Sequence, residues 1–264
     1  MTFQDVNTMR AEVSRNWLQA CLNGNRRAGE HRGLPVHPPE VARSALSCRE
    51  AGAFAAHIHP RDERGAESLL PRHVGAAVRA VRAAAPGMQV GVSTGEAIEE
   101  NLTRRLRAIA SWEDRPDFAT VNWYEHDADE TASLLVLQGV AVQAVLATVS
   151  DVRRMLRSPL AAQCRVMVVG PREEEPTAAL RTAEAILAVL DEAIPAVPCL
   201  VHGRDATAWP LLRLAVERGY LSRIGMEDTL ILSGGERCND NAQLVRQAQA
   251  LAVATAKAGQ EGGS

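Results

Sequence analysis

The segment Ala53-Phe54-Ala55-Ala56-His57-Ile58-His59 begins as an apolar run and ends on two histidines. In an extended strand, side chains two residues apart lie on the same face, so His57 and His59 would point one way and Ile58 the other. Two imidazoles at a strand end provide half of a metal site, although a His-x-His pair alone is a weak motif. Its meaning depends on the sheet that contains it and on a third ligand.

The same order of short apolar strand, polar end and helical segment recurs along the chain. We expect strands at 17–22, 53–59, 88–92, 118–121, 140–146, 164–169, 197–201 and 221–226. Helical spacing follows them at 38–51, 71–85, 97–111, 129–138, from 150, and at 176–192, 206–218 and 239–257. Such strand-helix units are typical of parallel crossovers. The pattern predicts an α/β fold, a single (β/α)8 TIM barrel over residues 17–258, with an N-terminal extension at 1–16 and a flexible tail at 259–264.

An open doubly wound sheet is the main alternative, because Gly91-Val92-Ser93-Thr94-Gly95 could be taken for a nucleotide loop. The chain has neither Gly-x-Gly-x-x-Gly nor Gly-Lys-Ser/Thr, so that interpretation lacks its phosphate-binding motif. In a barrel, the chemistry is expected where the strands end. Polar residues occupy the predicted ends: Asn23, His57, His59, Ser93, Thr94, Asn122, His202, Glu227 and Asp228.

Composition favours small-molecule chemistry over binding to nucleic acid or membranes. A hydrophobic content of 46% is ample for a core, and a net charge of -3 gives no global attraction to polyanions. The five cysteines are scattered without a Cys-x-x-Cys pair, which fits a reducing cytoplasm. We recognise no signal peptide and no membrane-spanning run, and expect a cytoplasmic protein. The single lysine, Lys257, lies near the C-terminus, which argues against Schiff-base chemistry.

A third metal ligand is available if the barrel closes. The last strand then returns to the first, so Glu227 would face the same mouth as His57 and His59. Two neutral imidazoles and a carboxylate leave coordination positions open, as in catalytic zinc sites. The alternative is a pair of histidines that only hydrogen-bond to loops. Similarly, Asp228 and Arg223 either form a structural ion pair, or Asp228 is a base, acting directly or by polarising Arg223.

Several motifs together resemble the β-keto acid cleavage enzyme family, which includes 3-keto-5-aminohexanoate cleavage enzyme. They run in family order over most of the chain: Asn23-Gly24-Asn25-Arg26-Arg27, Glu50-Ala51-Gly52-Ala53, His57-Ile58-His59-Pro60-Arg61, Ser93-Thr94-Gly95, Thr120-Val121-Asn122, Arg223-Ile224-Gly225-Met226-Glu227-Asp228 and Asn241-Ala242-Gln243-Leu244-Val245.

The resemblance implies that His57, His59 and Glu227 hold Zn²⁺, or another divalent metal, which binds a β-keto acid. It implies that Asp228 and Arg223 generate an enolate that attacks acetyl-CoA, and that retro-Claisen cleavage then yields acetoacetate and a new acyl-CoA. It also suggests a homo-oligomer, with a tetramer expected, and does not identify the residues that bind CoA. Four further residues would contact the substrate, or else serve as turn caps and strand-end hydrogen bonds: Ser93, Thr94, Thr120 and Asn122.

Departures from the family pattern indicate a short, divergent branch. Arg26 stands where the member with a cationic amino substrate has a glutamate, which predicts a substrate with a distal carboxylate or hydroxyl at Arg26. Gln143-Ala144-Val145 replaces a Glu-x-Glu at strand five, and the loop at 170–176 is short and charged. Trp123 and Tyr124 replace small residues, and either narrow the mouth or pack as ordinary aromatics.

Two other functions remain open at this point. A metal-dependent hydrolase or lyase barrel can also use His-x-His, but the amidohydrolase type needs more histidines and commonly a carbamylated lysine deep in the barrel. A catalytically degenerate metal-binding barrel is the non-enzymatic alternative, because strand five has lost two carboxylates. An enzyme is favoured over a degenerate barrel because the chain keeps the predicted metal ligands and the ion pair beside them: His57, His59, Arg223, Glu227 and Asp228.

Overall fold

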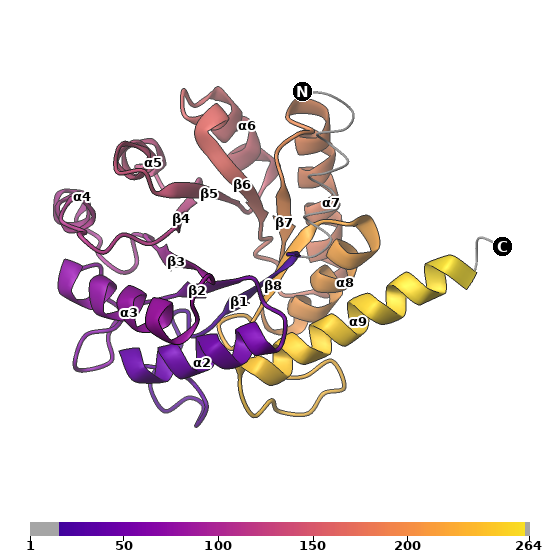
Figure 1. Cartoon of the computed structure of the whole chain (residues 1–264). Coiled ribbons are helices and arrows are strands. Elements are labelled where there is room, and N and C mark those ends of the chain that lie inside the picture. Colours follow the sequence, from indigo (N-terminus) through magenta and orange to yellow (C-terminus); the bar gives the residue numbers. More distant parts are fainter. Residues whose placement is uncertain (1–15, 262–264) are drawn as a thin grey trace.

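The computed structural model describes residues 16–261, and within them eight parallel strands close into one barrel (Figure 1). Strand order follows the chain, and β1 pairs with both β2 and β8. The strands are β1 (Leu18–Cys21), β2 (Ala55–Ile58), β3 (Gln89–Ser93), β4 (Phe118–Asn122), β5 (Ala141–Leu146), β6 (Cys164–Val169), β7 (Cys199–Val201) and β8 (Leu221–Ile224). This closure confirms the predicted single (β/α)8 barrel.

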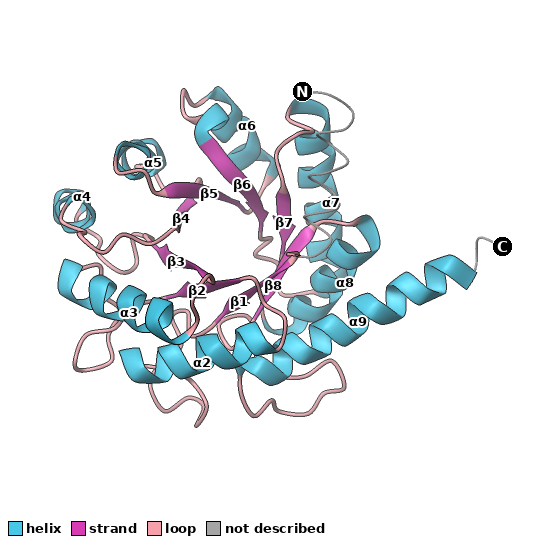
Figure 2. Ribbon diagram, viewed as in Figure 1, coloured by secondary structure: helices cyan, strands magenta, loops and turns pink. Residues whose placement is uncertain are grey.

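Helices surround the sheet on its outer side (Figure 2). They are α2 (Pro38–Glu50), α3 (Pro71–Ala84), α4 (Leu102–Ala110), α5 (Ala128–Leu137), α6 (Val149–Arg157), α7 (Pro176–Ala193), α8 (Ala208–Arg218) and α9 (Asn241–Glu261), with short 3-10 turns η1 (Ala161–Gln163) and η2 (Asp205–Thr207). The second half of α9 extends beyond the barrel wall (Figure 1). No helix within residues 16–261 combines the length and hydropathy that a bilayer crossing requires.

The strands are mostly apolar because the helices cover one face and the barrel interior covers the other, although Gln19 on β1, Gln143 on β5 and Ser222 and Arg223 on β8 are polar and buried. Every residue of β1, β2 and β8 is buried. On β3, Gly91 leaves room for a neighbouring ring, since a Cβ atom there would lie 1.9 Å from Cε2 of Phe118. Close packing of this kind fills the barrel interior with side chains, and the residues that line the open cavity lie at or beyond the ends of the strands, with the exception of a few such as Arg223 on β8.

Element boundaries differ from expectation mainly around two helices. The α4 helix begins at Leu102 and not near residue 97, because the Asn101 side chain caps it by accepting a hydrogen bond from the Arg104 amide. The segment before it forms a loop beside the barrel mouth. The α9 helix continues to Glu261, into the segment expected to be a flexible tail. The predicted extension at 1–16 lies outside the described residues, apart from Asn16.

Candidate metal centre

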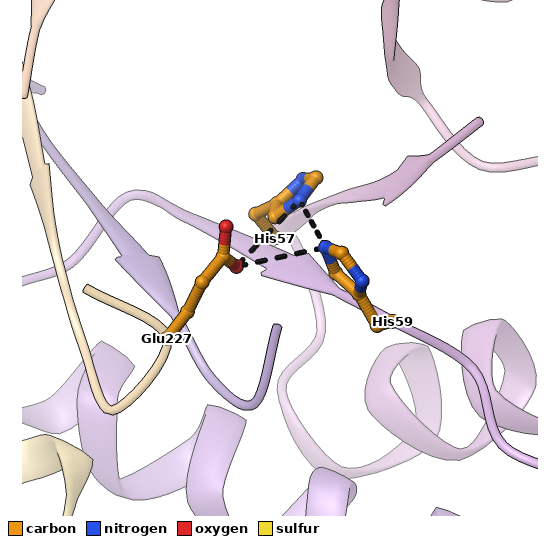
Figure 3. A group of neighbouring side chains, drawn as sticks. All are labelled: His57, His59 and Glu227. Atoms are coloured by element: carbon orange, nitrogen blue, oxygen red, sulfur yellow. Dashed lines mark hydrogen bonds and ion pairs between the residues drawn. The ribbon is translucent and has the colours of Figure 1, made fainter. Parts of the chain in front are cut away.

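Three predicted ligands converge at one end of the barrel (Figure 3). His57 lies near the end of β2, His59 follows that strand, and Glu227 lies in the loop after β8. Because β1 lies between β2 and β8 in the sheet, the ends of these two strands are held on either side of a single neighbour. All three residues are buried, with exposed fractions of 9% or less. The closed topology thus joins residues that are far apart in the sequence.

The ligand atoms are close enough to share one ion. His57 Nε2 and His59 Nε2 are 3.2 Å apart, and Glu227 Oε2 lies 3.7 Å from the first and 3.8 Å from the second. Glu227 Oε2 is buried without a hydrogen-bond partner among the described residues. A buried acceptor of this kind normally costs free energy unless a donor or cation compensates it. Two nitrogens and one carboxylate oxygen match the donor set of a catalytic zinc with open positions, so these residues fit such an ion.

The protonation states also suit a metal. Burial, only partly offset by the charge of Glu227, lowers the pKa of His57 to about 3, so its imidazole is neutral at pH 7. Burial alone would raise the pKa of Glu227, but the combined effect of its neighbours, with Arg223 the largest contributor, outweighs burial and holds that pKa below its ordinary range. A neutral imidazole and an ionised carboxylate are the forms that bind metals without first releasing a proton.

His59 is oriented by a carboxylate that sequence reasoning did not identify. Its Nδ1 forms a hydrogen bond with Glu67 Oε1, in a turn closed by an antiparallel bridge between Arg61 and Glu67. Asn23 holds the His59 backbone from both sides, accepting from its amide at 2.9 Å and donating to its carbonyl at 3.0 Å. A carboxylate on the far ring nitrogen sets the tautomer that leaves Nε2 free to bind a metal.

Glu227 is placed by a close contact with the first strand-helix loop. Gly24 has a φ of +53°, and a Cβ atom built there would lie 2.3 Å from Glu227 Cγ. Any larger residue would therefore strain the backbone and displace the carboxylate as well. Glycine at this position lets the loop after β1 pack directly against the metal ligand.

Arg223 and Asp228 form a buried ion pair behind the metal ligands. Arg223 Nη2 donates to Asp228 Oδ1 at 2.8 Å and to Glu227 Oε1 at 2.6 Å. Burial opposes the charge of Arg223, but Asp228 and Glu227 outweigh it and raise the pKa of the guanidinium. Asp228 is completely buried, and its Oδ2 has no hydrogen-bond partner among the described residues. The pair anticipated from the sequence is present, as an inner layer of the site.

A cavity of about 760 Å³ opens above these residues. The lining that matters for chemistry comprises His57, His59, Glu227, Arg223, His202, Ser93, Thr120, Asn122, Val145, Tyr124, Glu125, Arg172 and Arg204. A larger groove of about 940 Å³ lies along α7 and α8 and contains none of the three clustered ligands, so we place the chemistry in the smaller cavity.

The four polar residues expected to contact substrate do not all reach this cavity. Ser93, Thr120 and Asn122 line it, whereas Thr94 does not and donates its hydroxyl to the Thr120 carbonyl at 2.8 Å. Thr94 thus makes the strand-end hydrogen bond that was its alternative role. Asn122 Nδ2 donates to Glu125 Oε1 at 2.6 Å, so part of its capacity is already used.

Arg26 lies beside the site but is not among the residues that line the cavity. Its guanidinium donates to the carbonyl of Met226, to Glu30 Oε1 at 2.6 Å and to Asp205 Oδ1 at 2.7 Å. This geometry gives no support to the expected substrate contact at Arg26. It ties the first loop to the backbone that carries Glu227.

The sequence indicated Tyr124 as a cavity residue but did not indicate Arg172 or Glu125. Arg172, in the loop after β6, places its guanidinium carbon 3.7 Å from the centre of the Tyr124 ring, within the range of cation–π contacts. Tyr124 lines the cavity, whereas Trp123 is fully buried in the core. Of the two aromatic residues, only Tyr124 therefore narrows the mouth. Glu125 supplies a buried carboxyl on the same side.

Comparisons with known proteins agree with this architecture. A family model described as beta-keto acid cleavage enzyme matches residues 16–168 and 153–258. The apo structure of ObcA superposes with a TM-score of 0.67 at 14% identity, covering 82% of this chain and 61% of that one. A ternary complex of ObcA with a C4-CoA adduct and oxalate gives 0.69 at 14% identity, covering 84% and 64%.

A type I 3-dehydroquinate dehydratase from Clostridium difficile gives a TM-score of 0.60 at 12% identity and covers 91% of this chain and 94% of that one. At these identities the structural matches establish a shared barrel. The chain spans less than two thirds of the length of the ObcA chains.

Proposed function

Because the chain belongs to the beta-keto acid cleavage enzyme family, we propose that it cleaves a small β-keto acid at the centre formed by His57, His59 and Glu227. Zinc is the proposed metal and acetyl-CoA the proposed acceptor, with acetoacetate and a new acyl-CoA as products. The observation that carries the proposal is the convergence of three buried ligand atoms, each within 4.8 Å of the others, on a cavity large enough for a small acid.

The protein residues divide the remaining tasks. A divalent cation bound at this centre would supply Lewis acidity, which lowers the free energy of negative charge on a substrate oxygen. Arg223 holds Glu227 and Asp228 at fixed positions, and we assign Asp228 to the proton-transfer machinery. Ser93, Thr120 and Asn122 are proposed to orient the acid, since their side chains reach the cavity.

The choice of a CoA cosubstrate is supported by the complexes of ObcA. That protein has been solved with oxaloacetate, and with a C4-CoA adduct and oxalate. Both structures share the barrel of this chain at low sequence identity, so the specific acid is left to experiment. The expected tetramer and cytoplasmic location stay predictions; size-exclusion chromatography with light scattering tests the first.

A substrate panel tests the function. The zinc-loaded protein is incubated with acetyl-CoA and with 3-oxo acids that carry alkyl, hydroxyl, amino or carboxyl groups at the distal end. Mass spectrometry then measures acetoacetate and new acyl-CoA, with metal-stripped protein and Asp228→Asn as controls. Metal-dependent formation of both products supports the proposal. Hydrolysis without acyl-CoA would instead favour the metal-dependent hydrolase, and absence of any turnover would favour a degenerate barrel.

A further inference from the structure

The position of Asp228 raises a problem for direct proton transfer to or from the substrate. Its side chain has no exposed surface, and it is not among the residues that line the cavity. Its Oδ1 already accepts a hydrogen bond from Arg223 at 2.8 Å. A carboxylate in this position can act only through a neighbour that does reach the cavity.

Two neighbours of Asp228 line the cavity, Arg223 and His202. A guanidinium stays protonated in proteins and cannot accept a proton, so of the two only His202 can serve as a base. It follows β7 directly, lines the cavity, and places its Nδ1 3.4 Å from Asp228 Oδ1. Its other nitrogen, Nε2, lies beside Gly170, where a built Cβ atom would be only 2.6 Å away. Gly170 also lines the cavity, and Nε2 makes no hydrogen bond within residues 16–261. The ring therefore spans the distance between the buried carboxylate and the open cavity.

We propose that His202 is the residue that takes the proton from the α-carbon of the β-keto acid, with Asp228 as the carboxylate that orients it. The inference rests on the proposed function and assigns its proton-transfer step. A C–H bond breaks at the α-carbon, which lies between the carboxylate and the ketone. Its electron pair stays on the substrate as the enolate, and the proton forms an N–H bond at His202 Nε2. His202 Nδ1 is buried and has no hydrogen-bond partner among the described residues. In the substrate complex it donates to Asp228, which stabilises the imidazolium that results, as in Asp–His pairs of other enzymes.

The surroundings of His202 favour the form that a base requires. Burial, together with the charge of Arg223, lowers the pKa of His202, so the imidazole is neutral near pH 7 and can accept a proton. The separation of 3.4 Å is longer than a well-formed N–H···O bond. Catalytic hydrogen bonds are often long without substrate and shorten in the complex. Gly170 leaves Nε2 room to approach the substrate.

The test compares His202→Gln with the matched control His126→Gln, which alters an exposed histidine. Three quantities are measured: kcat for acyl-CoA formation, zinc affinity, and deuterium exchange at the α-carbon in D2O. The acid is the panel member that the wild-type protein cleaves fastest. Loss of a general base typically lowers the rate 10²- to 10⁴-fold, so we expect that loss in kcat and exchange for His202→Gln. Zinc affinity should fall far less than kcat, because His202 is not one of the three clustered ligands, and the control should match wild type.

Rescue separates a chemical role from a structural one. In His202→Ala, added imidazole should restore part of the deuterium exchange at the α-carbon. Imidazole can also bind the zinc, so wild-type protein at the same imidazole concentration serves as the reference. Wild-type kcat in His202→Gln, or absence of rescue in His202→Ala, would overturn the assignment while leaving the cleavage function standing. A wild-type protein that cleaves no member of the panel would overturn both.

Discussion

Replacing Gly24 with alanine should weaken metal binding without removing a ligand atom. The new Cβ would lie 2.3 Å from Glu227 Cγ, 2.8 Å from its Cβ and 3.1 Å from its Cδ. Real Cβ contacts essentially never fall below 3.0 Å, so the Glu227 side chain must move by at least about 0.7 Å. Zinc–ligand distances tolerate only about ±0.2 Å.

The expected loss follows from that mismatch. Disturbing a residue that supports a metal ligand typically lowers affinity 10- to 100-fold, which corresponds to about 1.4–2.7 kcal/mol. The left-handed backbone at Gly24, with φ of +53°, adds a stability cost of about 1–2 kcal/mol for any non-glycine residue. The first effect is read as zinc affinity by competition with a chelator, and the second as a lower midpoint of thermal unfolding.

Gly29→Ala is the matched control. Gly29 has a φ of +86°, so alanine meets a similar backbone strain, but no atom lies within 4 Å of the added carbon. We expect both variants to lose thermal stability and only Gly24→Ala to lose zinc affinity. Equal zinc affinity in Gly24→Ala and wild type would refute the view that Gly24 sets the position of Glu227.

Three other predictions concern the second ligand layer, a buried ion pair and the thiols. Glu67→Ala should weaken zinc 10- to 100-fold in the same chelator titration, because His59 loses its orienting carboxylate. Arg105→Ala should lower the free energy of unfolding, measured in urea, by about 3–5 kcal/mol, because it leaves Asp127 without its buried partner. The control Arg104→Ala removes an exposed ion pair and should change the free energy of unfolding little. Burial raises the pKa of all five cysteines, so the native protein at pH 8 should react slowly with Ellman's reagent and the unfolded protein rapidly; fast native reaction would contradict their burial.

The strands and their polar ends were predictable because parallel strands buried on both faces have a simple composition. The closed barrel then placed Glu227 beside His57 and His59, as the topology of the fold requires. The first residues of helices were harder to predict from the sequence. The α4 helix begins late because Asn101 caps it, whereas the helical spacing of the sequence continues back to residue 97.

Side-chain direction was the part that the sequence could not supply. Arg26 was expected to contact the substrate, but its guanidinium turns to Asp205 and the Met226 carbonyl, which come from loops about 180 or more residues later. Glu67 belongs to an irregular turn, where no periodicity indicates which way a carboxylate points. The burial of Asp228 behind Arg223, and with it the role proposed for His202, likewise depends on packing between neighbouring strand ends.

The most direct test of the account is a crystal structure of the zinc-loaded protein with anomalous data collected at the zinc edge. We predict one strong anomalous peak at the mouth of the barrel, within about 2.0–2.2 Å of His57 Nε2, His59 Nε2 and a Glu227 carboxylate oxygen, with at least one coordination position open to the cavity. A peak at another place, or a bound ion from which Glu227 is turned away, would contradict the metal centre and the cleavage chemistry built on it.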